Sequence, residues 1–181
     1  MPRLIVVGGG VRSGKSAFAL ARARELGSRR AFVATAQAFD GEMRARIERH
    51  VAERGDEFRT FEEPRALAPL LARLDAEVVV VDCLTLWLSN LLLAEPQPNL
   101  SELEGAIDAL CAQLAERRQH VILVTNEVGM GVVPESALGR LFRDVSGRAN
   151  QRVCAIADEI YFGALGCMLR LRPEPLGLVK G

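Results

Sequence analysis

The residues Gly9-Gly10-Val11-Arg12-Ser13-Gly14-Lys15-Ser16 match the pattern G-x-x-x-x-G-K-[ST]. They follow the apolar run 4–7 and precede the Ala-, Leu- and Arg-rich segment 16–26, which are the strand and the helix that this phosphate-binding motif requires. The glycines allow backbone amides to turn inward around an anion, and Lys15 supplies a charge for the β and γ phosphates. The Ser16 hydroxyl can join a Mg²⁺ shell. Since the three parts occur in this order, the pattern indicates a nucleoside triphosphate site rather than an incidental glycine-rich turn.

Strand-like and helix-like segments alternate along the rest of the chain. The apolar runs 30–35, 77–82 and 121–124 predict buried strands, and the segments 40–54 and 101–119 predict helices. Gly27 and Gly55 follow two of the predicted helices, as C-terminal cap glycines do.

The C-terminal third is expected to close the sheet. Residues 135–158 are mainly helical in pattern, with Gly147 as a candidate break, and 160–162 with 167–171 predict a hairpin. Alternating strands and helices predict an α/β, P-loop NTPase-like (RecA-like) three-layer sandwich, whose central sheet is mostly parallel with an antiparallel C-terminal edge. The length of 181 residues fits one nucleotide-binding catalytic domain over residues 1–181.

Composition narrows the class of protein. Lys plus Arg and Asp plus Glu both number 23, so no overall positive field attracts nucleic acid or anionic lipid. No apolar run approaches the length of a membrane span, and we expect a cytoplasmic protein with no nucleic-acid partner. The four cysteines lack a C-x-x-C pair, which disfavours a zinc site, and they are expected to be buried, reduced thiols.

Asp82 ends the four-valine run, where a carboxylate is expected to lie beside the phosphate loop and hold Mg²⁺ through water, together with Ser16. A strand-terminal Asp is by itself more often a turn residue or a helix cap. The run 125–131 (TNEVGMG) lacks the N-K-x-D segment of guanine-specific switches, which disfavours a signalling GTPase. A motor or recombinase would need a larger chain, so a small-molecule kinase or nucleotidyltransferase remains.

Five segments carry a more specific resemblance. GGVRSGKS at 9–16, ATA at 34–36, EMRARIERH at 42–50, VTNEVGMGVVPE at 124–135 and GRANQRVCAIADEIYF at 147–162 together resemble the bifunctional adenosylcobinamide kinase/adenosylcobinamide-phosphate guanylyltransferase family of cobalamin biosynthesis. The resemblance implies two reactions. A nucleoside triphosphate phosphorylates the aminopropanol hydroxyl of adenosylcobinamide, and GTP then transfers GMP to adenosylcobinamide phosphate, with release of pyrophosphate. It also implies a homotrimer.

The family's R-I-x-x-H pattern falls on His50, which the resemblance makes the residue that carries the guanylyl group. A neutral imidazole can attack an α-phosphorus near neutral pH. On a helix, Arg46, His50 and Arg54 share one face, so two guanidiniums would flank the developing charge. The alternative is a packed histidine at the edge of an apolar stripe on the same helix. The other histidine, His120, is expected to have a capping role between helix and strand.

The resemblance and the position at the sheet edge predict further contacts. Glu62 is expected to contact the guanosine, although a solvated loop glutamate is nearly as good an interpretation, and Asn126 with Glu127 is expected to contact phosphate or corrinoid. Asp82 stands where many relatives carry Glu, which shortens the reach by one methylene. The predicted catalytic residues are His50 and Lys15. The predicted nucleotide-binding residues are Gly9, Gly10, Val11, Arg12, Ser13, Gly14, Lys15, Ser16, Ala34, Thr35, Ala36, Val51, Ala52, Glu53, Arg54, Glu62 and Asp82.

Two other functions fit the same motifs. One is a phosphate-loop kinase without guanylyltransferase activity, and the other is a non-catalytic nucleotide-binding regulator. The predicted cofactor is Mg²⁺, with GTP and ATP as substrates, and the sequence leaves open which nucleotide serves the kinase step.

Overall fold

The computed structural model describes residues 1–37, 41, 51, 55–94, 99–174 and 178–179. Within them the strands are β1 (Leu4–Gly9), β2 (Arg30–Ala34), β3 (Arg59–Glu62), β4 (Val78–Asp82), β5 (His120–Val124), β6 (Glu159–Ala164), β7 (Cys167–Arg172) and β8 (Leu178–Val179). The helices are α1 (Lys15–Leu26), α3 (Leu67–Arg73), α4 (Leu84–Leu92), α5 (Leu100–Ala115) and α6 (Ala137–Ile156), with a 3₁₀ turn, η1, at Gly55–Glu57.

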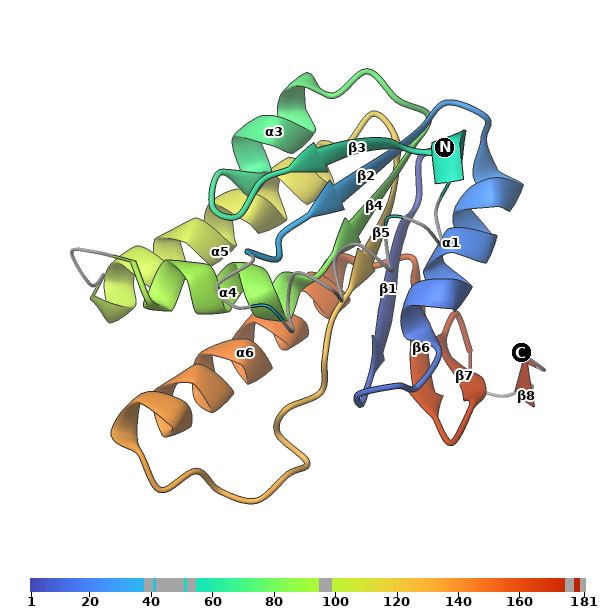
Figure 1. Cartoon of the computed structure of the whole chain (residues 1–181). Coiled ribbons are helices and arrows are strands. Elements are labelled where there is room, and N and C mark those ends of the chain that lie inside the picture. The colour runs from blue at the N-terminus through green and yellow to red at the C-terminus, as the bar shows by residue number, and fades with distance from the viewer. Residues whose placement is uncertain (38–40, 42–50, 52–54, 95–98, 175–177, 180–181) are drawn as a thin grey trace.

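Across this part of the chain the strands form one eight-stranded sheet in the order β3-β2-β4-β5-β1-β6-β7-β8. Neighbours from β3 to β6 are parallel, whereas β7 and β8 are added antiparallel. The predicted mostly parallel sheet with an antiparallel C-terminal edge is therefore confirmed. Because parallel strands end at the same edge, the turns after β1, β2, β4 and β5 converge there (Figure 1).

Helices cover both faces of the sheet, which explains why its central strands are continuously apolar. Leu4 and Val6 of β1 face the layer formed by α3, α4, α5 and α6, whereas Ile5 and Val7 face α1. Among the helices labelled in Figure 1, α1 lies on one side of the sheet and α3, α4, α5 and α6 lie on the opposite side. This arrangement confirms the predicted three-layer sandwich.

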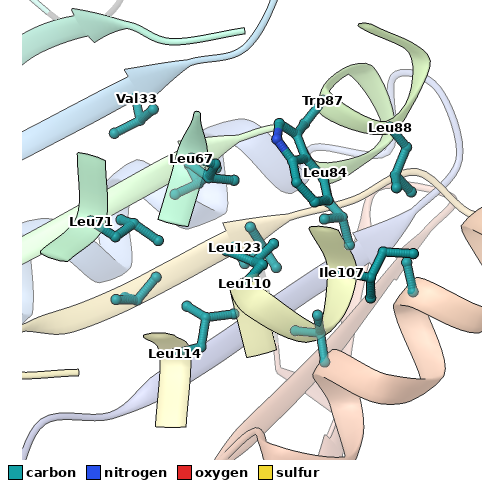
Figure 2. Packing of buried hydrophobic residues seen from close by; sticks show 14 of the residues in the cluster. Val33, Leu67, Leu71, Leu84, Trp87, Leu88, Ile107, Leu110, Leu114 and Leu123 are labelled. Carbon is teal, nitrogen blue, oxygen red and sulfur yellow. The ribbon is translucent and has the colours of Figure 1, made fainter. Parts of the chain in front are cut away.

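The larger core lies under α3, α4 and α5. Figure 2 shows their side chains gathered over the sheet, among them Leu71, Trp87 and Leu110, all of which are buried. Each fully buried side chain of this size contributes about 1.5–3 kcal/mol through loss of apolar surface to water. The indole Nε1 of Trp87 donates to the Arg65 carbonyl at 2.8 Å, so its only polar atom is also satisfied.

Two of the predicted helices differ from the observed ones in their limits. The prediction 101–119 is observed as α5, which ends at Ala115 because the chain then turns into β5, and Gln119 donates to the Leu71 carbonyl at 2.9 Å. Asn99 and Glu102 form a capping box that begins this helix. The helix predicted over 135–158 is observed as α6, which runs from Ala137 to Ile156. The predicted break at Gly147 is wrong, because the helix is continuous there. Burial of neighbouring residues on α6 outweighs the roughly 1 kcal/mol that a helical glycine costs.

The sequence pattern missed β3, α3, α4 and β8. The β3 strand has no buried residue, and α3 is only seven residues long, so neither gives a periodic signal. The residues of α4 are apolar on most sides, with Leu84, Trp87 and Leu88 buried, and a helix without a polar face shows little periodicity.

Two expectations about single residues also need correction. Cys83 is buried, but Cys111 and Cys154 are half-buried and Cys167 is exposed, because it follows the turn between β6 and β7. His120 is the first residue of β5 rather than a cap. Its Nδ1 accepts the backbone N–H of Arg3 at 3.1 Å and so joins the starts of two strands.

Candidate active site at the phosphate loop

The phosphate loop has the backbone conformation that its sequence predicts. Arg12 and Gly14 have φ angles of 55° and 86°, which are left-handed, and α1 begins immediately afterwards at Lys15. Left-handed residues beside a helix N-terminus turn successive backbone N–H groups toward one point, as a bound phosphate requires. Val11 and Arg12 are exposed, whereas Ser16 is half-buried.

Gly9 allows the loop to pass close to β6. Its φ is 149°, and a Cβ at this position would lie 2.5 Å from the Gly163 carbonyl oxygen and 2.8 Å from Ser13 Oγ. A Cβ on the neighbouring Gly10 would meet no heavy atom within 4 Å. Gly9 is therefore required by backbone packing, and Gly10 is not.

We expect Gly9→Ala to destabilise the fold by on the order of 3 kcal/mol, because the methyl group would overlap backbone atoms in a strained conformation. Gly10→Ala is the matched control and should change the free energy of unfolding by less than about 1 kcal/mol. Urea denaturation followed by circular dichroism measures both. Equal stabilities of the two variants would contradict this account of Gly9.

Lys15 is held inside the loop that precedes it. Its side chain is buried, with 8% of the residue exposed, and Nζ donates to the Gly10 carbonyl at 3.0 Å. Burial and, to a lesser extent, the Asp82 carboxylate raise the pKa of the Cys83 thiol to about 11, although the positive charge of Lys15 acts in the opposite direction. The ammonium group is thus held against the backbone of the phosphate loop.

The sheet register aligns three of the predicted residues along the ligand edge. Ala34 is paired with Glu62 of β3 on one side and with Asp82 of β4 on the other. Asp82 is paired with Val124 of β5, which is paired with Val7 of β1. Asp82 is expected beside the phosphate loop, with water between its carboxylate and Mg²⁺, and in the sheet β5 lies between β4 and β1. The two strands are therefore about 10 Å apart, which is consistent with contact through water rather than directly.

Thr35 has a structural task at this edge. Its hydroxyl donates to the Cys83 carbonyl at 2.8 Å and accepts the Cys83 N–H at 2.7 Å, and its own carbonyl accepts from Asn90 Nδ2 at 2.7 Å. Ala34 and Ala36 on either side are half-buried. The fully buried Thr35 side chain therefore fixes the segment after β4, and Asn90 is a contributor that the sequence pattern did not indicate.

A chain of hydroxyl groups joins α4, β5 and α6 behind the loop. Thr85 Oγ1 accepts the Asn126 N–H at 2.7 Å and lies 3.3 Å from Thr125 Oγ1, which donates to Asn150 Oδ1 at 2.8 Å. Because Thr125 uses its hydrogen on Asn150, Thr85 must be the donor in the contact between the two threonines. Thr125 also donates its backbone N–H to Val7 of β1.

We expect Thr125→Val to lower the free energy of unfolding by about 1–3 kcal/mol, since it leaves buried partners unsatisfied with little change in volume. Thr125→Ser keeps the hydroxyl and should recover most of the loss. Chemical denaturation of the three proteins tests this. If the serine variant is as unstable as the valine variant, the lost methyl group rather than the hydrogen bond explains the effect.

The loop between β5 and α6 starts against the phosphate loop. The Glu127 N–H donates to the Gly9 carbonyl at 3.1 Å, and Glu127 Oε1 accepts the Gly129 N–H at 2.6 Å. Arg143 of α6 donates to the Gly129 carbonyl at 2.7 Å. The structure thus brings the TNEVGMG segment to the phosphate loop, as expected of residues at the ligand edge.

A divalent cation at this edge would depend on nucleotide oxygens. Among the described residues, no group of three or more His, Cys, Asp or Glu side chains is arranged to hold a metal ion. Mg²⁺ is commonly bound through one or two protein ligands together with substrate phosphates, so Ser16 and Asp82 fit that mode. No helix in the described ranges is long and apolar enough to cross a membrane.

Several predicted residues lie outside the described part of the chain. They are His50, Ala52, Glu53 and Arg54, together with most of the predicted helix 40–54. Gly41 and Val51 are described, and both are helical and exposed. Glu62 is the last residue of β3 and is exposed, rather than a loop residue.

Solved structures similar to this one share its fold. A solved ATPase domain matches with a TM-score of 0.55 at 13% identity, over 98% of this chain and 80% of that one. The flagellar accessory protein FlaH from Methanocaldococcus jannaschii matches with a TM-score of 0.51 at 11% identity, over 93% of this chain and 76% of that one. With the strand order and the phosphate loop, these likenesses confirm the P-loop NTPase-like fold.

Sequence relatives are much more similar. The bifunctional adenosylcobalamin biosynthesis protein CobP of Pseudomonas aeruginosa is 45% identical over 172 residues, 93% of this chain and 96% of that protein. The corresponding CobU protein of Escherichia coli is 40% identical over 181 residues, 93% of this chain and 99% of that protein. The model of the family described as cobinamide kinase / cobinamide phosphate guanyltransferase matches residues 5–171. The resemblance is confirmed, and the chain belongs to the cobinamide kinase / cobinamide phosphate guanyltransferase family of bifunctional enzymes.

Proposed function

We propose that the chain phosphorylates the aminopropanol hydroxyl of adenosylcobinamide and then transfers GMP from GTP to the resulting phosphate. The products of the second reaction are adenosyl-GDP-cobinamide and pyrophosphate. The observation that carries this proposal is the formed phosphate loop, with Lys15 held at its centre, in a chain of this family. Membership of the family also supports a place in cobalamin biosynthesis.

In the kinase step, the loop amides and Lys15 bind the β and γ phosphates of the nucleotide. The acceptor hydroxyl attacks the γ-phosphorus, the bond to the β–γ bridging oxygen breaks, and the nucleoside diphosphate leaves. Lys15 stabilises the negative charge that grows on the phosphates in the transition state. Mg²⁺, held by Ser16 and through water by Asp82, would neutralise part of the same charge.

In the guanylyl step, an imidazole nitrogen of His50 attacks the α-phosphorus of GTP, and pyrophosphate leaves. The acceptor phosphate then attacks the phosphorus of the guanylyl-histidine, which frees the imidazole. Val51, Ala52, Glu53 and Arg54 follow His50 and are proposed to contact the nucleotide with it. Glu62 aligns with Ala34 and Asp82 on the ligand edge, which supports a guanosine contact through its carboxylate.

A turnover assay tests the function and separates it from the two alternatives. Purified protein is incubated with adenosylcobinamide, Mg²⁺ and either ATP or GTP, and the corrinoid products are identified by mass spectrometry. The proposal predicts the phosphorylated corrinoid first and the GDP-linked product when GTP is present. Product that stops at the phosphate supports a kinase alone, and no product with any nucleotide supports a regulator.

The resemblance to the family also supports a homotrimer, and the balanced charge of the sequence supports a cytoplasmic protein without a nucleic-acid partner. Sedimentation equilibrium of the purified protein tests the homotrimer directly. A monomeric or dimeric mass at assay concentrations would contradict it.

A further inference from the structure

A basic cavity lies at the edge of the sheet opposite the phosphate loop. Its volume is about 460 Å³, and its charged lining residues are Arg3, Arg22, Asp158, Glu159 and Arg170. Arg3 precedes β1, Glu159 begins β6, and Arg170 is paired with Tyr161 near the end of the antiparallel β7. The cavity therefore lies at the amino ends of β1 and β6, and Arg22 places it beside the second half of α1. The positions of these three elements can be followed in Figure 1.

The carboxylates at this cavity are already occupied. Glu159 accepts from Arg3 at 2.9 Å, from Arg22 at 3.1 Å and from the Tyr161 hydroxyl at 2.7 Å. Asp158 accepts the Leu4 N–H at 2.6 Å and is ion-paired with Arg117. Both oxygens of Glu159 and the Oδ2 atom of Asp158 therefore already accept hydrogen bonds from the protein.

The arginines outnumber the carboxylates around the cavity. Its lining has the guanidiniums of Arg3, Arg22 and Arg170 and the carboxylates of Asp158 and Glu159, which is an excess of one positive charge. The local positive field extends to His120, whose pKa is lowered by burial and then by Arg3, the N-terminal ammonium group and Arg117. The whole chain has no net charge, so this excess is local.

Arg170 differs from the other arginines of the cavity in its hydrogen bonding. Within the described residues it makes no hydrogen bond or ion pair, and its Nε is buried and unsatisfied. The Nε atoms of Arg22 and Arg117 are also buried without an acceptor in that part of the chain. Arg170 lines the cavity, and its guanidinium has no acceptor among the described residues, so the cavity presents an unpaired cation to a negatively charged hydrogen-bond acceptor.

We propose that this cavity is a second phosphate-binding site, which takes inorganic phosphate, pyrophosphate or the terminal phosphate of a nucleotide. The planar fork of Arg170 can bind two oxygens of a phosphate at once, and the local excess of one positive charge favours an anion. The volume is sufficient for a diphosphate. The inference does not depend on the proposed function, because no residue of the phosphate loop takes part.

Occupation of this site would act on the helix that starts at the phosphate loop. Arg22 lies seven residues after Lys15 on α1, which is about 10 Å along the helix axis. A ligand in the cavity would therefore contact the far half of the helix whose first residue serves the active site.

Calorimetric titration in a Lys15→Met background tests the proposal, because that change weakens phosphate binding at the first site. Phosphate, pyrophosphate and GTP are titrated separately, and the one that binds tightest identifies the source of the phosphate group. We expect saturable binding that becomes about tenfold or more weaker when Arg170→Gln is added. Arg29→Gln is the matched control, since Arg29 forms an exposed ion pair with Asp75, and it should leave the affinity unchanged.

Two results would overturn the second site. One is no saturable binding of any of the three ligands up to about 10 mM, a concentration that would reveal a millimolar affinity. The other is equal affinity with and without Arg170→Gln. Arg170→Lys, which keeps the charge and loses the fork, should bind with intermediate affinity, and circular dichroism verifies that each variant is folded. Affinity of the lysine variant as weak as that of the glutamine variant still supports bidentate recognition by Arg170.

Discussion

Replacing Lys15 with Met should lower kcat/KM of the kinase reaction by about 10²–10³-fold while the protein remains folded. The methionine side chain has a similar length and can fill the buried space, so the change removes mainly the charge and the hydrogen bond to Gly10. The lost interaction is strongest in the transition state, when charge builds on the phosphates, and the effect should therefore appear in kcat as well as in KM. Steady-state formation of the phosphorylated corrinoid measures both constants.

Lys180→Met is the control for this experiment, because Lys180 is the other lysine of the sequence and lies outside every predicted site. Its kinetic constants should equal those of the unaltered chain. Thermal unfolding of both variants shows whether any loss of turnover comes from loss of structure. Near-normal turnover by a folded Lys15→Met protein would mean that phosphoryl transfer does not use this loop.

The phosphate loop could be predicted from sequence because its requirements are local. Left-handed backbone at Gly14, a strand before it and a helix after it are all encoded within residues 4–26. Position along the chain also predicted that Asp82 ends a strand, since the four valines before it are continuous. The motif was therefore sufficient to predict the β1–loop–α1 unit and the edge of the sheet where the ligand binds, even though the order of the strands was unknown.

Strand order and long-range hydrogen bonds could not be predicted in the same way. The position of β5 between β1 and β4 follows from how the helices pack on both faces, which no single segment encodes. Thr85, Thr125 and Asn150 are joined by side-chain hydrogen bonds between residues 40 and 25 positions apart. The sequence around each residue therefore does not indicate which residue is its partner. The excess of arginine around the cavity at the opposite edge is invisible in a chain whose total charge is zero.

Replacing His50 with Ala should abolish covalent labelling by GTP that is radiolabelled at the α-phosphorus. A phosphoramidate is labile in acid and stable in alkali, so the label on the unaltered chain should have both properties. Guanylyl transfer should fall by about 10³-fold or more, because direct attack of the acceptor on GTP would lose the activated nucleophile. The kinase reaction, assayed separately with ATP and adenosylcobinamide, should change by no more than a few-fold, because Lys15 and the phosphate loop are intact.

His120→Ala provides the matched control, since the chain has two histidines and both variants lose one imidazole. The His120 imidazole is engaged by the Arg3 N–H where β1 and β5 start, at the edge opposite the phosphate loop. The His120→Ala variant should therefore keep the label and both activities. Its free energy of unfolding should at most decrease because one hydrogen bond is lost. Equal labelling of the His50→Ala and unaltered proteins would refute the histidine intermediate. If His50→Ala instead loses the label while transfer continues at the normal rate, the acceptor phosphate must attack GTP directly, and one phosphate loop would then serve two direct displacements at different phosphorus atoms.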